Sequence, residues 1–436
     1  MIPVLTAAAL LAVGCTAEKI STSETASAVT ELVIPESSEL PARYDAREDG
    51  RTAPVKNQGD LGTCWAFASL LALESRLLPE ESFDFSEDHM SHDPAFLLDQ
   101  KSGGDYIMAM AYLLSWKGPV LEAEDPYGDG VSPEGLKPAK HVQEIQILPE
   151  YDRDAVKRAV YGTGGVQSAL YTTLQGQSQD SRYYNQETNA YYYPGTQPPN
   201  HDVVIVGWDD DYPAENFSSL PPDNGAFLCE NSWGTEFGED GYFYVSYYDT
   251  NLGTTNLLYS SVEEPDNYDR IYQSDLCGWL GQIGYGSGQV WAANVYEASR
   301  ERQQVCAAGF YATGRDTEYN ISIVREVPEH PSDADWTRLK RKKAGSVLGK
   351  LSYAGYYTIP LSEPVEVLPG ERFAVLVELS TPGTVHPMAI EYDPGDERCR
   401  VDLTDGEGYL SADGDLWEPV EEQKCNLCLK AYTVLP

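Results

Sequence analysis

The sequence predicts an α+β domain followed by an all-β sandwich. An apolar run that begins at Cys64 and stops before Pro79 is long enough for a buried helix. Residues 201–208 are rich in Val and Ile, which is typical of a buried strand. Beyond about residue 270, short alternating runs recur between Gly, Pro and Asp, as in β-sandwiches. The chain has 436 residues, 42% of them hydrophobic, enough for two or three domains with real cores.

The N-terminus carries the features of a secretion signal. Residues 2–14 form an apolar stretch that is too short to span a bilayer as a helix. Leu11-Ala-Val-Gly-Cys15 resembles a bacterial lipoprotein box, in which the cysteine is lipidated. We therefore expect residues 1–15 to be a signal peptide with Cys15 as the lipid attachment site, and the Ser/Thr/Glu-rich residues 16–39 to be a flexible tether.

Cys64 opens the apolar run within Asn-Gln-Gly-Asp-Leu-Gly-Thr-Cys-Trp-Ala-Phe-Ala, residues 57–68. A thiol at a helix N-terminus faces the positive end of the helix dipole, which favours the reactive thiolate. An isolated cysteine is more often a small buried apolar residue. Two distant segments favour the reactive alternative here.

Those segments supply a histidine and an asparagine in a fixed order. His201 leads the Val/Ile-rich strand, and Asn231 stands in Phe-Leu-Cys-Glu-Asn-Ser-Trp-Gly, residues 227–234. Each alone is more often structural than catalytic. Together they place Cys, His and Asn in one chain order, with a spacing that is typical of papain and the cathepsins.

Residues 40–262 resemble the papain-like cysteine peptidases. The matching motifs are Gln58-Gly59, residues 62–67, Asn200-His201, Val206-Gly207 and residues 231–234. Softer matches are residues 40–47, Asp125-Pro126-Tyr127 and Gly103-Gly104. The resemblance implies a papain-like α+β fold, with a helical half and a β-barrel-like half.

The resemblance also implies a role for each catalytic residue. Cys64 would attack the scissile carbonyl, and His201 would pair with the thiolate and then protonate the leaving amine. Asn231 would orient the ring of His201. Gln58 would form the oxyanion hole with the backbone N–H of Cys64.

Three residues are assigned to substrate binding on the same grounds. The backbone of Gly103 and Gly104 would hold a substrate strand, and Trp233 would border the site and shield the His–Asn hydrogen bond from water. The chain departs from the family at Leu61, where a second cysteine is usual, and at Thr63. Asp202 follows the histidine where a small apolar residue is common, and we expect it to be a solvated carboxylate.

The second half begins after a linker at residues 262–270, so we expect a peptidase domain at 40–262 and a sandwich domain at 263–436. Strands are predicted over residues 290–295, 305–311, 319–324, 356–361, 373–379 and 427–434. No helical period of any length is visible, and the basic run at residues 338–343 is interpreted as an exposed loop or strand end.

This half resembles the lectin-like domain that follows papain-like domains in some bacterial and archaeal secreted peptidases. The matching residues are 266–269, Gly278-Trp279, Tyr285-Gly286, 291–295, 308–311 and 410–414. The resemblance implies a sandwich and only weakly a sugar ligand. Four tryptophans could stack on sugar rings, but core or interface packing is the more common role: Trp279, Trp291, Trp336 and Trp417.

Six cysteines remain besides Cys15 and Cys64, an even set that allows up to three disulfides in a secreted chain. Strand alternation turns Cys229 toward the peptidase interior, so we expect a free thiol there and two disulfides within the sandwich. The Cys425-x-x-Cys428 pair has no second pair for a metal site and no redox-fold context. We expect no cofactor and no metal, since no segment has a calcium-loop pattern.

The formal charge of −39 argues against nucleic acid as a partner, because phosphate binding needs clustered cations. We therefore interpret the chain as a secreted, membrane-tethered cysteine endopeptidase that acts on proteins or peptides. One alternative is a glycan-binding surface adhesin with a vestigial peptidase domain. Another is a cysteine transpeptidase or a peptidoglycan-peptide hydrolase on the same fold.

Overall fold

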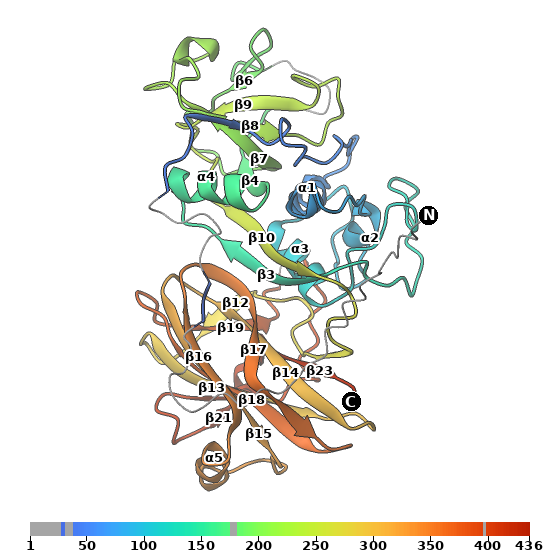
Figure 1. The fold of residues 1–436 in the computed structure, drawn as a ribbon, viewed down its shortest axis with the longest axis vertical. Coiled ribbons are helices and arrows are strands. Elements are labelled where there is room, and N and C mark those ends of the chain that lie inside the picture. The colour runs from blue at the N-terminus through green and yellow to red at the C-terminus, as the bar shows by residue number, and fades with distance from the viewer. Residues whose placement is uncertain (1–27, 31–37, 175–180, 396–397) are drawn as a thin grey trace, which may run out of the picture.

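The computed structural model describes residues 28–30, 38–174, 181–395 and 398–436, so Cys15 and the expected signal peptide lie outside the described residues. The chain folds into two domains stacked along the longest axis of the molecule (Figure 1). No described helix is long and apolar enough to cross a membrane.

The peptidase half begins with helices at the positions that its apolar runs predict. The run at Cys64 forms the buried helix α1, which ends before the breaker Pro79 as expected. Asp105 caps α3, because its carboxylate accepts hydrogen bonds from the backbone N–H groups of Ile107 and Met108. The helices of this half are α1 (Cys64–Leu77), α2 (Glu87–Ser91), α3 (Tyr106–Leu114) and α4 (Arg153–Gly162).

The strands of this half form one sheet, ordered β3-β10-β4-β7-β8-β9-β6-β5, with β2 also paired to β7. The predicted strand at His201 is β7, which is almost wholly buried. It runs antiparallel to β8, so the start of β7 lies beside the end of β8. The strands are β2 (Arg43–Asp45), β3 (His141–Ile147), β4 (Val166–Leu170), β5 (Tyr184–Asn185), β6 (Ala190–Tyr191), β7 (His201–Asp209), β8 (Ala226–Glu230), β9 (Tyr242–Ser246) and β10 (Asn256–Glu263).

The second half is a β-sandwich, as predicted. One layer is a seven-stranded sheet, ordered β1-β16-β15-β18-β13-β20-β21, and the other contains β11, β23, β14 and β17. Alternate apolar residues of both layers share one core. The strands are β11 (Arg270–Tyr272), β12 (Gly281–Ile283), β13 (Gln289–Glu297), β14 (Gln303–Ala312), β15 (Thr317–Arg325), β16 (Ala344–Leu351), β17 (Ala354–Val367), β18 (Arg372–Ser380), β19 (Met388–Tyr392), β20 (Gly408–Ser411), β21 (Glu418–Pro419), β22 (Cys425–Leu427) and β23 (Leu429–Val434).

Two expectations about local structure are wrong. The basic run at 338–343 was expected to be a loop or strand end, but its first residues close α5 (Asp333–Lys340), which buries Trp336 and Leu339. A capping box between Ser332 and Asp335 starts this helix. Within the expected flexible tether, residues 28–30 form β1 (Ala28–Thr30), which pairs in parallel with β16.

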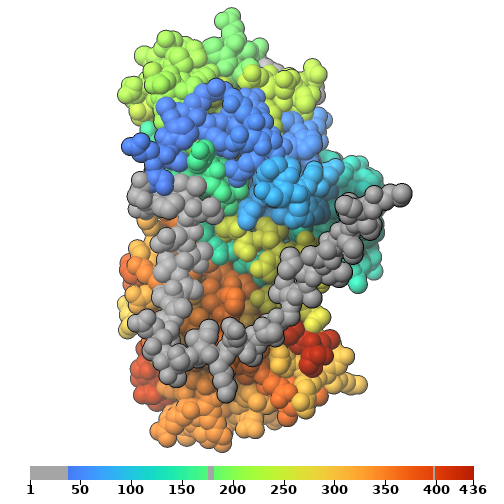
Figure 2. Space-filling model, in the orientation of Figure 1, coloured from blue at the N-terminus to red at the C-terminus, as the bar shows by residue number. Residues whose placement is uncertain are grey.

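The two domains share a sheet. Strand β17 of the sandwich pairs with β3 of the peptidase, from Ala354 opposite Ile147 to Tyr357 opposite Glu144. This pairing joins the strands of both halves into one 13-stranded sheet. Tyr311 and Tyr356 of the sandwich belong to the same buried cluster as the peptidase core. The space-filling view shows the two domains in direct contact (Figure 2).

The cysteines follow the sequence-based expectation only at Cys229, which is a buried free thiol. The two disulfides expected within the sandwich are not formed, because every cysteine of the described residues is free. Cys425 packs in the sandwich core, whereas Cys428 packs in the cluster shared with the peptidase. The backbone thus directs the two thiols of this pair into different cores.

Candidate active site

Cys64 is the first residue of α1 and borders a pocket of about 220 Å³. The preceding residue, Thr63, is wholly buried and its Oγ1 donates to the hydroxyl of Tyr127 at 2.6 Å. That hydroxyl in turn donates to the backbone oxygen of Gln58 at 3.0 Å. Tyr127 therefore links Thr63 to Gln58 and stabilises the loop that precedes the thiol.

His201 lines the same pocket, and its ring is held on two sides. Its Nε2 lies 2.8 Å from Oδ1 of Asn231, the residue that directly follows β8. Trp233 stacks on the ring with 4.5 Å between the ring centroids. Because a carbonyl oxygen only accepts, Nε2 carries the proton and Nδ1 keeps a lone pair for another group.

Burial controls the protonation of the thiol and the imidazole. Burial, with a smaller contribution from the carboxylate of Asp202, raises the pKa of Cys64 to about 12, although backbone N–H groups of Asp202 and Trp65 oppose the rise. Burial also lowers the pKa of His201 to about 4, an effect that its hydrogen bond to Asn231 opposes. Each group taken singly is therefore neutral at pH 7.

Gln58 is buried beside this pair and its amide is fixed at both ends. Its Oε1 accepts from Ser232 Oγ at 2.6 Å, and its Nε2 donates to the backbone oxygen of Leu61 at 2.7 Å. An amide nitrogen has two hydrogens, so one donor remains for an oxyanion.

The glycines expected to hold substrate lie against the catalytic loop. Gly103 has φ of +87°, which favours glycine, and a Cβ on Gly104 would lie 2.4 Å from Nε1 of Trp65. A Cβ on Gly62 would lie 2.9 Å from the backbone nitrogen of Gly103. Gly104 lines the pocket, whereas Trp233 is buried behind His201, a position that favours shielding over substrate contact.

Asp202 is not the solvated carboxylate that we expected. It is half-buried in the pocket wall next to His201, and its Oδ2 accepts from Nε2 of Gln167 at 2.9 Å. Burial raises its pKa to about 6, and the charge of Asp105 adds to this effect.

Asp105 is a pocket residue that sequence reasoning missed. Besides capping α3, its Oδ2 accepts from Nη1 of Arg398 at 2.7 Å, a residue of the sandwich domain. Backbone hydrogen bonds also join residues 398–400 to the peptidase half. The N–H of Leu97 donates to the oxygen of Arg398, and the N–H of Arg400 donates to the oxygen of Ala95. The second domain therefore reaches the rim of the pocket.

Four separate segments supply the residues expected from the sequence. Cys64 and His201 line one pocket, Asn231 is hydrogen-bonded to His201, and Gln58 is hydrogen-bonded to Ser232, which follows Asn231. Within the described ranges, the one group of carboxylates close enough to share a metal ion lies outside this pocket.

Two family descriptions match the chain. The papain family cysteine protease description covers residues 40–261. The lectin like domain description covers residues 271–433. The first match contains the whole pocket and the second contains the sandwich.

Two curated relatives each match about half of this chain. Cathepsin K of Gallus gallus is 32% identical over 222 residues, which are 48% of this chain and 60% of the cathepsin. Cathepsin S of Bos taurus is 30% identical over 215 residues, 47% of this chain and 59% of that protein. The chain thus spans about three fifths of the length of these relatives.

Solved structures match both halves together. The clostridial cysteine protease Cwp84 after propeptide cleavage is 29% identical, with a TM-score of 0.78, over 90% of this chain and 99% of that one. The cysteine protease and lectin-like domains of Cwp84, a surface layer associated protein of Clostridium difficile, are 27% identical. They also give a TM-score of 0.78, over 91% of this chain and 90% of the other.

Proposed function

Because the chain belongs to the papain family of cysteine proteases, we propose that it is an endopeptidase that hydrolyses proteins through Cys64, His201, Asn231 and Gln58. The hydrogen bond of 2.8 Å between His201 and Asn231, beside a pocket that Cys64 also lines, carries this proposal. None of the residues that the chemistry needs is missing, which argues against a vestigial peptidase.

The proposed mechanism starts with transfer of the Cys64 proton to Nδ1 of His201. The thiolate sulfur bonds to the scissile carbonyl carbon, and the resulting oxyanion is stabilised by Gln58 and the backbone N–H of Cys64. His201 then protonates the leaving amine as the C–N bond breaks. Water, deprotonated by His201, releases the acid product and restores the thiol.

The pocket wall favours substrates with a cationic side chain. Asp105 is already paired with Arg398, whereas the side chain of Asp202 has, among the described residues, only the neutral amide of Gln167 as its hydrogen-bond partner. An ionised Asp202 can therefore attract a lysine or arginine of the substrate, with little competition from other charges. A preference for substrates with a lysine or arginine side chain is therefore part of the proposed function.

The catalytic assignment is tested on the protein without residues 1–15, incubated with casein and a thiol-reactive epoxide. The epoxide should label Cys64 and stop hydrolysis, and Cys64→Ser should be folded but inactive, because the neutral alcohol is a far weaker nucleophile. Cys306→Ser is the matched control, since this half-exposed thiol on β14 lies in the other domain. Casein cleavage by purified Cys64→Ser would contradict the assignment.

The rival acyl-transfer chemistry differs only in what attacks the thioester. Product analysis with a peptide library and an added amine distinguishes water from an amine acceptor. Free carboxyl termini alone indicate hydrolysis, and products joined to the amine indicate transpeptidation.

We propose that the protein acts outside the cytoplasm at the cell surface, a location supported by its likeness to Cwp84, itself surface layer associated. Attachment through a lipid on Cys15 is part of this proposal. Several acyl chains give stable anchoring, at roughly 0.8 kcal/mol per buried CH₂. In a bacterium with lipoprotein processing, Cys15→Ala should leave the membrane fraction, and soluble wild-type protein would contradict the anchor.

A carbohydrate partner of the lectin-like domain is the weaker part of the proposal. Trp336 and Trp417 stack on each other in a buried cluster, and Trp279 packs on Tyr311. These rings follow the packing role expected of them, so a glycan would need other residues. A glycan array with the full chain tests for such a ligand.

A further inference from the structure

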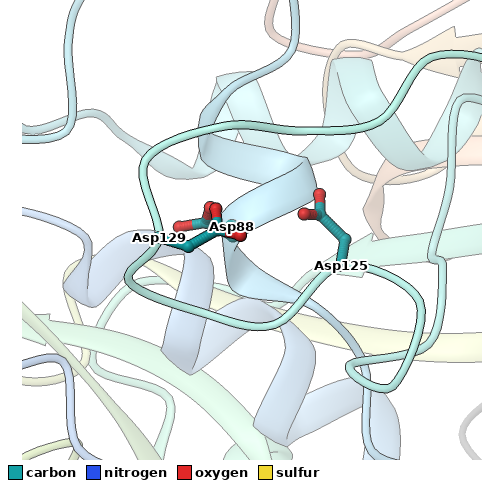
Figure 3. Close-up of side chains that lie close together, drawn as sticks. All are labelled: Asp88, Asp125 and Asp129. Atoms are coloured by element: carbon teal, nitrogen blue, oxygen red, sulfur yellow. The ribbon is translucent and has the colours of Figure 1, made fainter.

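Three aspartates converge beneath the catalytic loop, away from the pocket. Asp88 lies on α2, and Asp125 and Asp129 lie on the loop that follows residue 121. One carboxylate oxygen of each lies within 4.8 Å of those of the other two. Figure 3 shows the side chain of Asp125 turned toward those of Asp88 and Asp129.

Two of these carboxylates are buried and incompletely bonded. Asp88 is 0% exposed and Asp125 is 1% exposed. Oδ2 of Asp88 and Oδ1 of Asp125 have no hydrogen-bond partner among the described residues. A buried carboxylate oxygen without a partner is costly, so it calls for a compensating group.

Protein cations do not provide that compensation within the described part of the chain. No lysine or arginine there forms an ion pair with the three aspartates, and the nearest basic group is Nε2 of His92, 3.8 Å from Oδ2 of Asp88.

We propose that Asp88, Asp125 and Asp129 bind a calcium ion. Calcium takes oxygen ligands at about 2.3–2.6 Å, so two ligands of one ion lie at most about 5 Å apart. The three oxygens lie within 4.8 Å of one another, which is compatible with that limit. Asp129 is exposed, so water can complete the six to eight ligands from its side.

The ion would brace the loop that supports the catalytic cysteine. Tyr127 stands between Asp125 and Asp129, and its hydroxyl bonds to Thr63 and to the backbone of Gln58. Asp88 itself accepts from Nε2 of Gln100 at 2.8 Å and from the backbone N–H of Gly128 at 3.2 Å. Calcium would therefore fix α2, the aspartate loop and the segment before Gly103 relative to one another.

The test is calcium titration of the full chain after treatment with a chelator, by calorimetry and thermal melting. Asp129→Asn and Asp125→Asn should each bind one calcium ion fewer than wild type. At a free concentration of 100 times Kd, this ion should raise the Tm of wild type by about 5–11 °C. Both variants should lack that part of the rise. Asp223→Asn, which removes an exposed carboxylate elsewhere, should behave like wild type.

Without the ion, Asp125→Asn should melt at or above the Tm of wild type, because it relieves repulsion between carboxylates. A purely structural aspartate would instead make this variant less stable under the same conditions. An unchanged calcium stoichiometry in Asp129→Asn and Asp125→Asn would overturn the site. An equal rise in Tm with magnesium at the same concentration would overturn the assignment to calcium.

Discussion

Gly355 controls the junction between the two domains, and replacing it with alanine should uncouple them. It lies on β17 opposite Gln146 of β3, with φ of +139°. A Cβ there would lie 2.1 Å from the backbone oxygen of Ile145. An ordinary van der Waals contact is at least 3.4 Å long. The backbones of β17 and β3 must therefore move apart by more than about 1 Å to accommodate the Cβ.

The cost follows from two contributions. The left-handed conformation costs an alanine about 1–2 kcal/mol. Parting the strands removes about two hydrogen bonds, at about 1 kcal/mol each. The free energy of unfolding should therefore fall by about 3 kcal/mol, which lowers the Tm of a domain of this size by about 6–12 °C.

Thermal melting of Gly355→Ala beside Gly370→Ala measures this cost. Gly370 also has a positive φ, +71°, but a Cβ there meets nothing within 4 Å. Gly370→Ala should lose only the backbone contribution of about 1 kcal/mol. Equal losses of Tm in the two variants would refute the steric argument and the importance of the β3–β17 pairing.

Three further outcomes follow from the pocket. Gln58→Ala should lower kcat by about 10²–10³ with little change in KM, and an unchanged kcat would place the oxyanion hole elsewhere. Because the pKa of Asp202 is about 6, its carboxylate is charged above that pH and neutral below it. The ratio of kcat/KM for arginine-containing peptides to kcat/KM for neutral peptides should therefore rise as the pH increases through about 6. In the control variant Asp202→Asn, this ratio should not depend on pH. Tyr127→Phe removes both hydrogen bonds to the catalytic loop, so kcat should fall by about tenfold and the Tm should fall by a few degrees, as measured by steady-state kinetics and melting.

The catalytic segments were predictable because their signals are local. The apolar run at Cys64 and the Val/Ile run at His201 each specify their own element, and α1 and β7 form where these runs lie. The alternating runs of the second half likewise predicted the strands of the sandwich. Helix α5 also has a local signal, the Ser332-x-x-Asp335 capping box, but apolar periodicity alone does not indicate this helix.

Other features depend on segments that are far apart in the chain. The sequence by itself determined the type and order of the main elements and the residues that resemble a peptidase triad. Only the tertiary structure decided that Asp202 lies half-buried in the pocket that Cys64 lines, that Arg398 reaches Asp105, and that β17 continues the peptidase sheet. The physical reason is that periodicity and capping act within one element, whereas burial, charge pairing and edge-strand pairing are set by which distant segments meet.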